Sequence, residues 1–297
     1  MRRILKEDRV EIPGYDEIWK VVYPSILKRM QDIKPITVGN FRRWQLSIYN
    51  IKGARNAFFN IINLKIDLYL LQDESQYSTI GDDFNDSEVD PNMVIGEDKK
   101  VNRINIRIKV GTSQKNMQKD IETEFYHEIT HAYQYYERLK NGSRVHELRS
   151  NATYEVATLR NIINNEIMTP LEKNLAFLLY YIDPDEFDSR LNAFYNEIKY
   201  QRPKAGDDIK DIIVKTKEWR KIDFLYQTIY MMGKVTAQQD QQRLIVVANA
   251  MNAKISTNRY ADYPTLLKDA TDKYNELRNN SWREFYKIVQ RIIKYGK

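Results

Sequence analysis

The chain has 297 residues, of which 42% are hydrophobic, 47 are Lys or Arg and 41 are Asp or Glu, so its formal net charge is +6. The hydrophobic content is sufficient for a folded core, which excludes a disordered protein, and the near balance of charges argues only weakly for nucleic acid as a partner. The chain contains no cysteine, which excludes disulfides and thiolate-bound zinc. Any metal site must therefore be built from imidazole and carboxylate groups.

No apolar run reaches the length of a signal-peptide core or a membrane span, and the first eight residues are already strongly charged. We therefore expect a protein without a signal peptide or transmembrane segment, located in the cytoplasm and without a membrane partner. Export would have to use a non-standard signal.

The first hundred residues predict helices followed by a strand. Apolar residues recur at helical spacing from Asp16 to Lys34, but Pro24 lacks a backbone donor, so we expect two short helices there. Apolar and polar residues then alternate from Asn63 to Leu70, which predicts a half-buried strand. The acidic stretch from Asp82 to Asp90 is expected to be a solvated loop. It is not a calcium loop, because Pro91 occupies the turn position that requires glycine.

A second strand is predicted from Val101 to Val110. Ile104, Ile106 and Ile108 alternate with polar residues, so one face should be buried and the other polar and basic. An exposed edge strand of this kind can pair with an extended peptide, which makes it a candidate substrate-binding strand. A basic outer face is also an ordinary protection of a sheet edge.

The next stretch, Gly111 to Asn141, predicts an amphipathic helix that carries the main chemical motif. Its apolar stripe consists of Phe125, Ile129, Ala132 and Tyr136, at spacings of three and four residues. Two histidines also lie four residues apart on this helix, in the run His-Glu-Ile-Thr-His that starts at residue 127.

The spacing of that run supplies two metal ligands and a base. His127 and His131 project from adjacent turns of one helical face, which lets both imidazoles reach one Zn²⁺ ion at roughly 2.0 to 2.1 Å. Glu128 then faces a metal-bound water and can take its proton. The chain has only three histidines, so about 0.002 such motifs are expected by chance.

A strand followed by a long helix with His127, Glu128 and His131 resembles the zincin metallopeptidases, and the continuation Ala-Tyr-Gln resembles phage and bacterial members. The resemblance covers about Val101 to Gly142 and is weaker over the following sixty or so residues. It implies an α+β zincin-like domain with a small sheet and an active-site helix. It also implies that the two histidines bind zinc and that Glu128 is the catalytic base.

The third metal ligand cannot be read from the motif alone. The metzincin subgroup would need Gly and His where this chain has Gln134 and Glu137, so that subgroup is excluded. The chain otherwise resembles the gluzincins, which take a glutamate from a later helix. His146 is the remaining histidine, but its spacing is atypical for a ligand.

Three later glutamates are therefore candidate ligands: Glu147, Glu155 and Glu186. Glu186 follows Asp183 and Pro184 in an element that looks like the turn-to-helix segment that carries the glutamate in some phage and bacterial relatives, and we favour it. The same residues also form an ordinary helix start, and Ser189 replaces an alanine that relatives commonly carry. With no fourth histidine, an oxyanion would have to be stabilised by arginine or by one of 21 tyrosines.

Beyond about Gln201 to Asp207 the pattern predicts helices only, from Ile209 to Met232, from Val235 to Ala253 and from Pro264 to the end. We therefore expect a zincin-like metallopeptidase domain over residues 1–202 and a helical C-terminal extension over residues 203–297. The last helix has a basic outer side, which is typical of a capping or oligomer helix with a solvated face. Homo-oligomerisation or an assembly partner is expected through these helices.

The function predicted from the sequence is a zinc-dependent peptidase that hydrolyses peptide bonds with a metal-bound water activated by Glu128. Its partner would be a peptide or protein substrate. The alternative is a structural or assembly protein, such as a phage virion or tail component, built on a zincin-like domain with retained or lost activity. In that case the protein would be located in the virion.

Overall fold

The computed structural model describes residues 12–38, 41–49, 59–71, 88–89, 94–95, 101–110, 117–141, 158–159, 161–163, 165–182, 184–252 and 259–295. Helices and strands are both present, so the expected α+β class is confirmed. The chain forms two compact units, Met1–Leu148 with Asp188–Tyr200, and Arg149–Phe187 with Gln201–Lys297. These units are discontinuous in sequence. The predicted boundary between two domains, at residues 202 and 203, stays a prediction.

The first unit contains a mixed sheet, which in the described residues has six strands. Their order is β1-β2-β3-β6-β4, and β5 also pairs with β6. Strands β3 and β6 are parallel, and the other pairs are antiparallel. The strands are β1 (Ile36–Val38), β2 (Phe41–Tyr49), β3 (Phe59–Leu71), β4 (Glu88–Val89), β5 (Val94–Ile95) and β6 (Val101–Val110).

One face of this sheet is a continuous apolar surface. The pairing register places Leu46 beside Ile66 and Ile66 beside Ile106, and all three side chains are buried. Because side chains alternate between faces, residues two positions away along each strand extend the same apolar surface. The predicted strands from Asn63 to Leu70 and from Val101 to Val110 are confirmed.

Strand β6 differs from the expected edge strand. On the side opposite β3 it pairs with β4 at Ile106 and Arg107, and with β5 at Val101 and Arg103. Those positions are therefore not open to a peptide. The expectation of an exposed edge was wrong there because residues 88–89, which we expected in a solvated loop, form a strand instead.

The first helix, α1 (Tyr15–Asp32), is continuous and contains Pro24 in its interior, so the expectation of two short helices was wrong. Its buried side chains Ile18, Val22 and Ile26 lie on one face on both sides of the proline. Burial of this face stabilises a single helix against the loss of one backbone hydrogen bond. The Ser25 hydroxyl also donates to the Val21 carbonyl.

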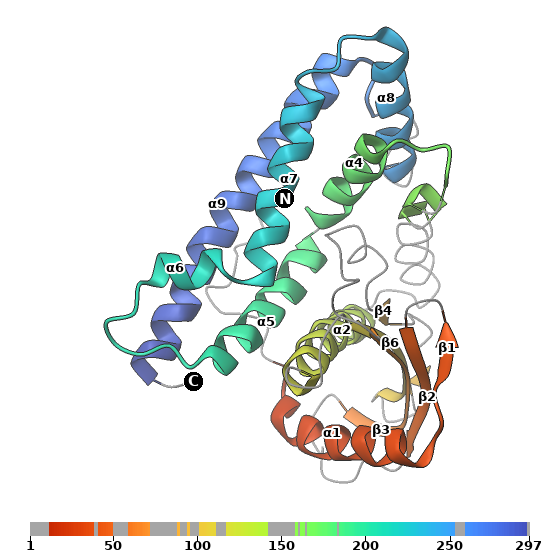
Figure 1. Cartoon of the computed structure of the whole chain (residues 1–297), viewed down its shortest axis with the longest axis vertical. Helices are drawn as coiled ribbons and strands as arrows, with labels where there is room; N and C mark the ends of the chain where they lie inside the picture. Colours follow the sequence, from red (N-terminus) through yellow and green to blue (C-terminus); the bar gives the residue numbers. More distant parts are fainter. Residues whose placement is uncertain are drawn as a thin grey trace. The chain divides into compact units, whose positions relative to one another are not determined.

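Helix α2 (Met117–Lys140) carries the predicted metal motif. Figure 1 shows α1 and α2 on the same side of the sheet, and both helices share a core cluster with its apolar face. The predicted stripe residues Phe125, Ile129 and Ala132 are fully buried. Tyr15 of α1 stacks on Tyr126 with ring centroids 3.8 Å apart. The core therefore fixes which side of α2 faces away from the sheet.

The second unit is helical in its described residues. Its helices are α4 (Pro170–Tyr181), α6 (Ile209–Val214), α7 (Lys217–Met232), α8 (Gln238–Asn252) and α9 (Tyr263–Tyr295), and the first residues of α5 (Pro184–Gln201) also belong to it. The single helix predicted from Ile209 to Met232 is interrupted, because Thr216 caps α7 by accepting from the Trp219 amide. Trp219 in turn contacts Trp282 of α9 with ring centroids 4.9 Å apart.

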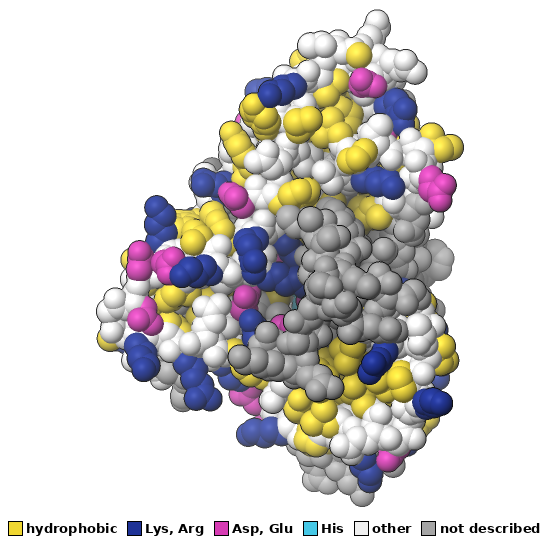
Figure 2. All heavy atoms as spheres, viewed as in Figure 1, with side chains coloured by type: hydrophobic (Ala, Val, Ile, Leu, Met, Phe, Trp, Pro, Cys, Tyr) yellow, Lys and Arg dark blue, Asp and Glu magenta, His cyan; other side chains and the backbone are white. Residues whose placement is uncertain are grey.

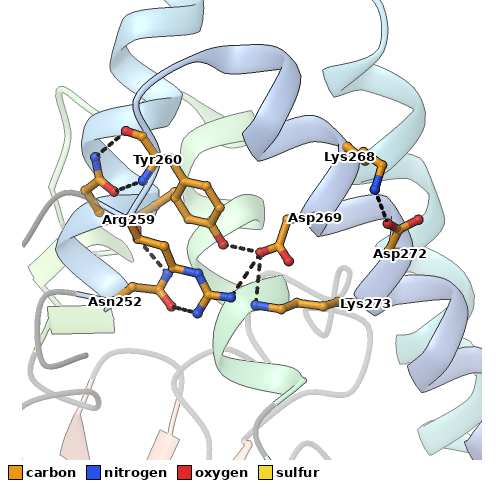
Figure 3. A network of polar contacts seen from close by, with 9 residues as sticks. Asn252, Arg259, Tyr260, Lys268, Asp269, Asp272 and Lys273 are labelled. Carbon is orange, nitrogen blue, oxygen red and sulfur yellow. Dashed lines mark hydrogen bonds and ion pairs between the residues drawn. The ribbon is translucent and has the colours of Figure 1, made fainter. Parts of the chain in front are cut away.

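Two ionic clusters hold these helices together. Glu172 completes a capping box with Thr169 at the start of α4 and also accepts two hydrogen bonds from Arg243 of α8, at 2.7 and 2.9 Å. Figure 3 shows the second cluster, in which Arg259, Tyr260 and Lys273 all contact the carboxylate of Asp269. This second cluster ties the start of α9 to the residues that precede it.

In the helical unit, hydrophobic side chains are exposed between charged ones of both signs (Figure 2). Tyr226, Tyr230 and Met231 of α7 are each about half exposed. Among the described residues, no helix has both the length and the apolar character needed to cross a membrane.

Candidate metal centre

The two motif histidines face each other on α2. Their ring centroids are 4.9 Å apart, and the Nε2 atoms of His127 and His131 are separated by 3.2 Å. The ligand spacing expected for two imidazoles on adjacent helical turns is therefore present. His131 is 8% exposed, so the pair lies close to the protein interior.

Glu186 joins this pair. Its carboxylate and the ring nitrogens of His127 and His131 offer three ligand atoms that all lie within 4.8 Å of one another. Glu186 lies in the first turn of α5, which begins at Pro184 as its helix-start signal predicts. The other candidate ligands, His146, Glu147 and Glu155, lie outside the described residues, as does Asp183.

Helix α5 reaches the histidines because it runs antiparallel to α2 along a polar seam. Asn192 donates to Thr130 at 2.9 Å, and Asn196 donates to Thr123 at 3.0 Å. Each threonine hydroxyl gives its own proton to a backbone carbonyl of α2, so a lone pair remains for the asparagine. These bonds fix the register between the two helices.

At the far end of the seam, the partly buried Tyr200 donates a hydrogen bond to the buried carboxylate of Glu122. Burial raises the pKa of Glu122, and the hydrogen bond from Tyr200 and the charge of Lys199 only partly oppose this rise. Burial and the same hydrogen bond raise the pKa of Tyr200. The tyrosine therefore remains a proton donor over the whole neutral range.

Gln134 orients the second histidine. Its Oε1 lies 3.1 Å from His131 Nδ1, and an amide oxygen can only accept a hydrogen bond. Nδ1 therefore carries the proton, and the lone pair of Nε2 points toward His127. An outer partner that fixes the tautomer in this way is usual for metal-binding histidines.

Two further side chains touch the cluster. Tyr180, near the end of α4, donates a hydrogen bond to Glu186 Oε1. Ser189 lies one turn after Glu186 on α5, and its Oγ is 3.2 Å from His131 Nε2. Ser189 has no exposed surface, and Glu186 is 3% exposed. The Glu186 carboxylate thus accepts a hydrogen bond from the Tyr180 phenol, and the Ser189 hydroxyl lies one helical turn after it.

Glu128 lies beside the histidines and is buried, with 1% of its surface exposed. Its Oε1 is 3.9 Å from His127 Nε2. The Glu128 carboxylate therefore lies next to His127, but it does not belong to the cluster of three possible metal ligands.

The donor set fits a divalent metal ion. Two ligands that each lie 2.0 to 2.1 Å from a tetrahedral ion are about 3.3 to 3.4 Å apart, and the two histidine nitrogens are separated by 3.2 Å. Two imidazoles and one carboxylate are also a combination found in metal sites. His127, His131 and Glu186 could therefore hold a metal ion.

No family model, no curated protein and no solved structure matches this chain significantly.

The sequence predicted that His127, His131 and Glu186 would lie together, and the structure brings these three side chains together. The catalytic role predicted for Glu128 stays a prediction. Gln134 was considered only as a departure from the metzincin pattern, although it lies three residues after His131, where a helical side chain can reach the ring. Ser189 was considered only as a departure from the alanine that relatives commonly carry, although it lies three residues after Glu186 on the same helix. No sequence signal singles out Tyr180 among 21 tyrosines.

Proposed function

We propose that this protein is a zinc-dependent peptidase of the zincin type. The observation that carries the proposal is the convergence of His127, His131 and Glu186 from two helices, with the buried carboxylate of Glu128 beside them. Each of these residues has the chemical type that the motif requires, and the third comes from a later helix, as in gluzincins. The resemblance of the motif to zincins adds support from the sequence.

In this proposal His127, His131 and Glu186 hold the ion, and Gln134 and Tyr180 orient the second and third of these ligands. Bound Zn²⁺ would supply a Lewis acid that lowers the pKa of water toward about 7.

Glu128 does the proton transfer. As a carboxylate beside the centre it takes a proton from the attacking water and gives it to the departing amine of the peptide. The proton thus moves from water to the leaving group, while the oxygen of that water forms the new carboxyl group. Burial of Glu128 keeps bulk water from competing for this proton.

The test compares Glu128→Gln with wild type on a peptide library, with metal content measured on the same samples. We expect the Glu128→Gln protein to keep its zinc and to lose at least about 100-fold in cleavage rate, because only the proton acceptor is removed. Glu137→Gln, a substitution farther along the same helix at a side chain that is 36% exposed, is the matched control and should cleave normally. Equal cleavage by Glu128→Gln and wild type would contradict the proposal.

His127→Ala tests the metal itself. Removal of one imidazole should abolish stoichiometric zinc, measured by metal analysis after dialysis against a weak chelator. A wild-type protein without zinc affinity would overturn the proposal at its first step.

A second function, assembly with other protein copies or partners, is favoured by the exposed Tyr226, Tyr230 and Met231 on α7. Aromatic residues and methionine are enriched at protein interfaces. Zinc binding without cleavage of any peptide would support an assembly protein that uses the centre for structure only.

A further inference from the structure

We propose that the Ser189 hydroxyl oxygen is a fourth protein ligand of the metal held by His127, His131 and Glu186. This inference rests on the metal site of the proposed function, but it does not require that the protein cleaves peptides. It concerns the position that a catalytic zinc site normally leaves open.

The first support is a distance. Ser189 Oγ lies 3.2 Å from His131 Nε2, the same separation as that between His131 Nε2 and His127 Nε2. Two ligands on one tetrahedral ion are about 3.3 to 3.4 Å apart. Ser189 and His127 thus both stand at ligand spacing from His131.

The second support is the protonation of His131. Since Gln134 Oε1 fixes the proton on Nδ1, Nε2 offers only a lone pair, which can accept from the Ser189 hydroxyl. A bound metal ion takes this lone pair, so the hydrogen bond between Ser189 and His131 cannot persist. The serine oxygen is then next to a cation, which attracts the negative end of the hydroxyl dipole.

The third support is the rigidity of the helix that carries Ser189. Ser189 and Glu186 are three residues apart on one face of α5, and both are buried. The bonds of Asn192 and Asn196 to α2 hold the following turns of α5 in place. Ser189 therefore stays at the centre when the ion binds instead of moving away with its helix.

Four protein ligands close a tetrahedral zinc site, which is typical of structural sites. A neutral hydroxyl is the weakest of these four donors, so water or a substrate carbonyl would displace it first. The resting centre would accordingly be closed, and Ser189 would be its exchangeable ligand.

The test uses Ser189→Cys and cobalt. The natural chain has no cysteine, so a thiolate-to-cobalt charge-transfer band in the near ultraviolet can come only from position 189. Zn²⁺ and Co²⁺ deprotonate a coordinating thiol. We expect Ser189→Cys protein loaded with one equivalent of Co²⁺ to show this band and to bind the ion more than about tenfold more tightly than wild type.

Ser281→Cys is the matched control, because Ser281 is equally buried but lies on α9 outside the centre. It should bind Co²⁺ as wild type does and show no charge-transfer band. If wild type binds one Co²⁺ and Ser189→Cys also binds it without the band, the fourth-ligand inference is overturned and the three-residue site stands. If wild type binds no Co²⁺, both fail together.

Ser189→Ala covers the case in which the cysteine variant does not fold. Loss of a protein ligand should change the visible cobalt spectrum and weaken Co²⁺ binding by about tenfold. A cobalt spectrum and an affinity identical to those of wild type would refute a ligand role for Ser189.

Discussion

At the scale of single residues, the centre depends on atoms that are held in one orientation by neighbours. His131 is held by Gln134 at 3.1 Å, and Glu186 accepts a hydrogen bond from Tyr180. Each of these partners restricts the rotation of the side chain that it contacts. Side chains that are already oriented would lose less entropy on binding a metal ion.

Gln134→Ala should weaken zinc binding by about tenfold, because it removes the acceptor that holds the proton of His131 on Nδ1. Competition with a chelator of known affinity measures this loss. Gln134→Glu keeps an acceptor at the same place and should restore the affinity. A Gln134→Ala protein with the zinc affinity of wild type would show that the amide does not orient the ring.

At the scale of helices, the pairing of α2 with α5 decides which distant residues meet. The seam uses Asn192 with Thr130 and Asn196 with Thr123, all of them buried or nearly so. Buried polar pairs give little net stability, but an unmatched partner is costly. The seam thus favours one register between the helices over its neighbours.

Asn196→Leu should lower the free energy of unfolding by about 1 to 3 kcal/mol, because the buried hydrogen bond from Asn196 to the Thr123 oxygen is lost. Urea unfolding followed by circular dichroism measures the change. The double variant Thr123→Val with Asn196→Leu removes both polar groups and should recover most of the loss. If the two changes simply add, the pair is not coupled.

At the scale of the whole molecule, the two units should respond to pH with opposite sign. In the helical unit, burial disfavours ionisation of Glu172 and Asp269, but hydrogen bonds from Arg243 and Thr169 to the first, and from Tyr260 and Lys273 to the second, outweigh it and lower both pKa values. A lowered pKa gives stability that is complete above the usual value near 4 and is lost as the pH falls through the folded value. Lowering the pH below about 4 should therefore reduce the stability of the helical unit.

Glu122 has the opposite effect in the first unit. Burial raises its pKa, so the folded protein holds this proton more tightly than the unfolded chain does. Stability from Glu122 is present at low pH and is lost as the pH rises from the usual value near 4.3 through the folded value.

Hydrogen exchange measured by mass spectrometry between about pH 2.5 and pH 7, after correction for the intrinsic rate, tests this difference. We expect peptides of α8 and α9 to lose protection as the pH falls below about 4, because the lowered pKa values of Glu172 and Asp269 place the loss there, and we expect Asp269→Asn to reduce that loss. Glu122→Gln should reduce the pH dependence of peptides from α2 and leave α9 unchanged. If protection changed with pH in the same direction in both units, these carboxylates would not cause the pH dependence of stability.

The sequence predicted those parts of the structure that follow from local periodicity. Strand β6 was expected at its observed bounds, and the histidines of α2 were expected on one face, because the pitch of a helix and the pleat of a strand fix which neighbours share a side. The predicted break at Pro24 was wrong. The free-energy cost of the missing backbone hydrogen bond is outweighed by burial of an apolar face that continues along α1.

By itself, the sequence determined the two imidazoles, the neighbouring carboxylate, the absence of thiol ligands and the start of the helix that carries Glu186. Only the tertiary structure brought Glu186 to the histidines, placed Ser189 and Tyr180 beside them, and covered β6 with β4 and β5. The physical reason is that contacts within one helix follow from its backbone geometry. A contact between helices some sixty residues apart depends on how their side chains pack, and no short pattern encodes that packing.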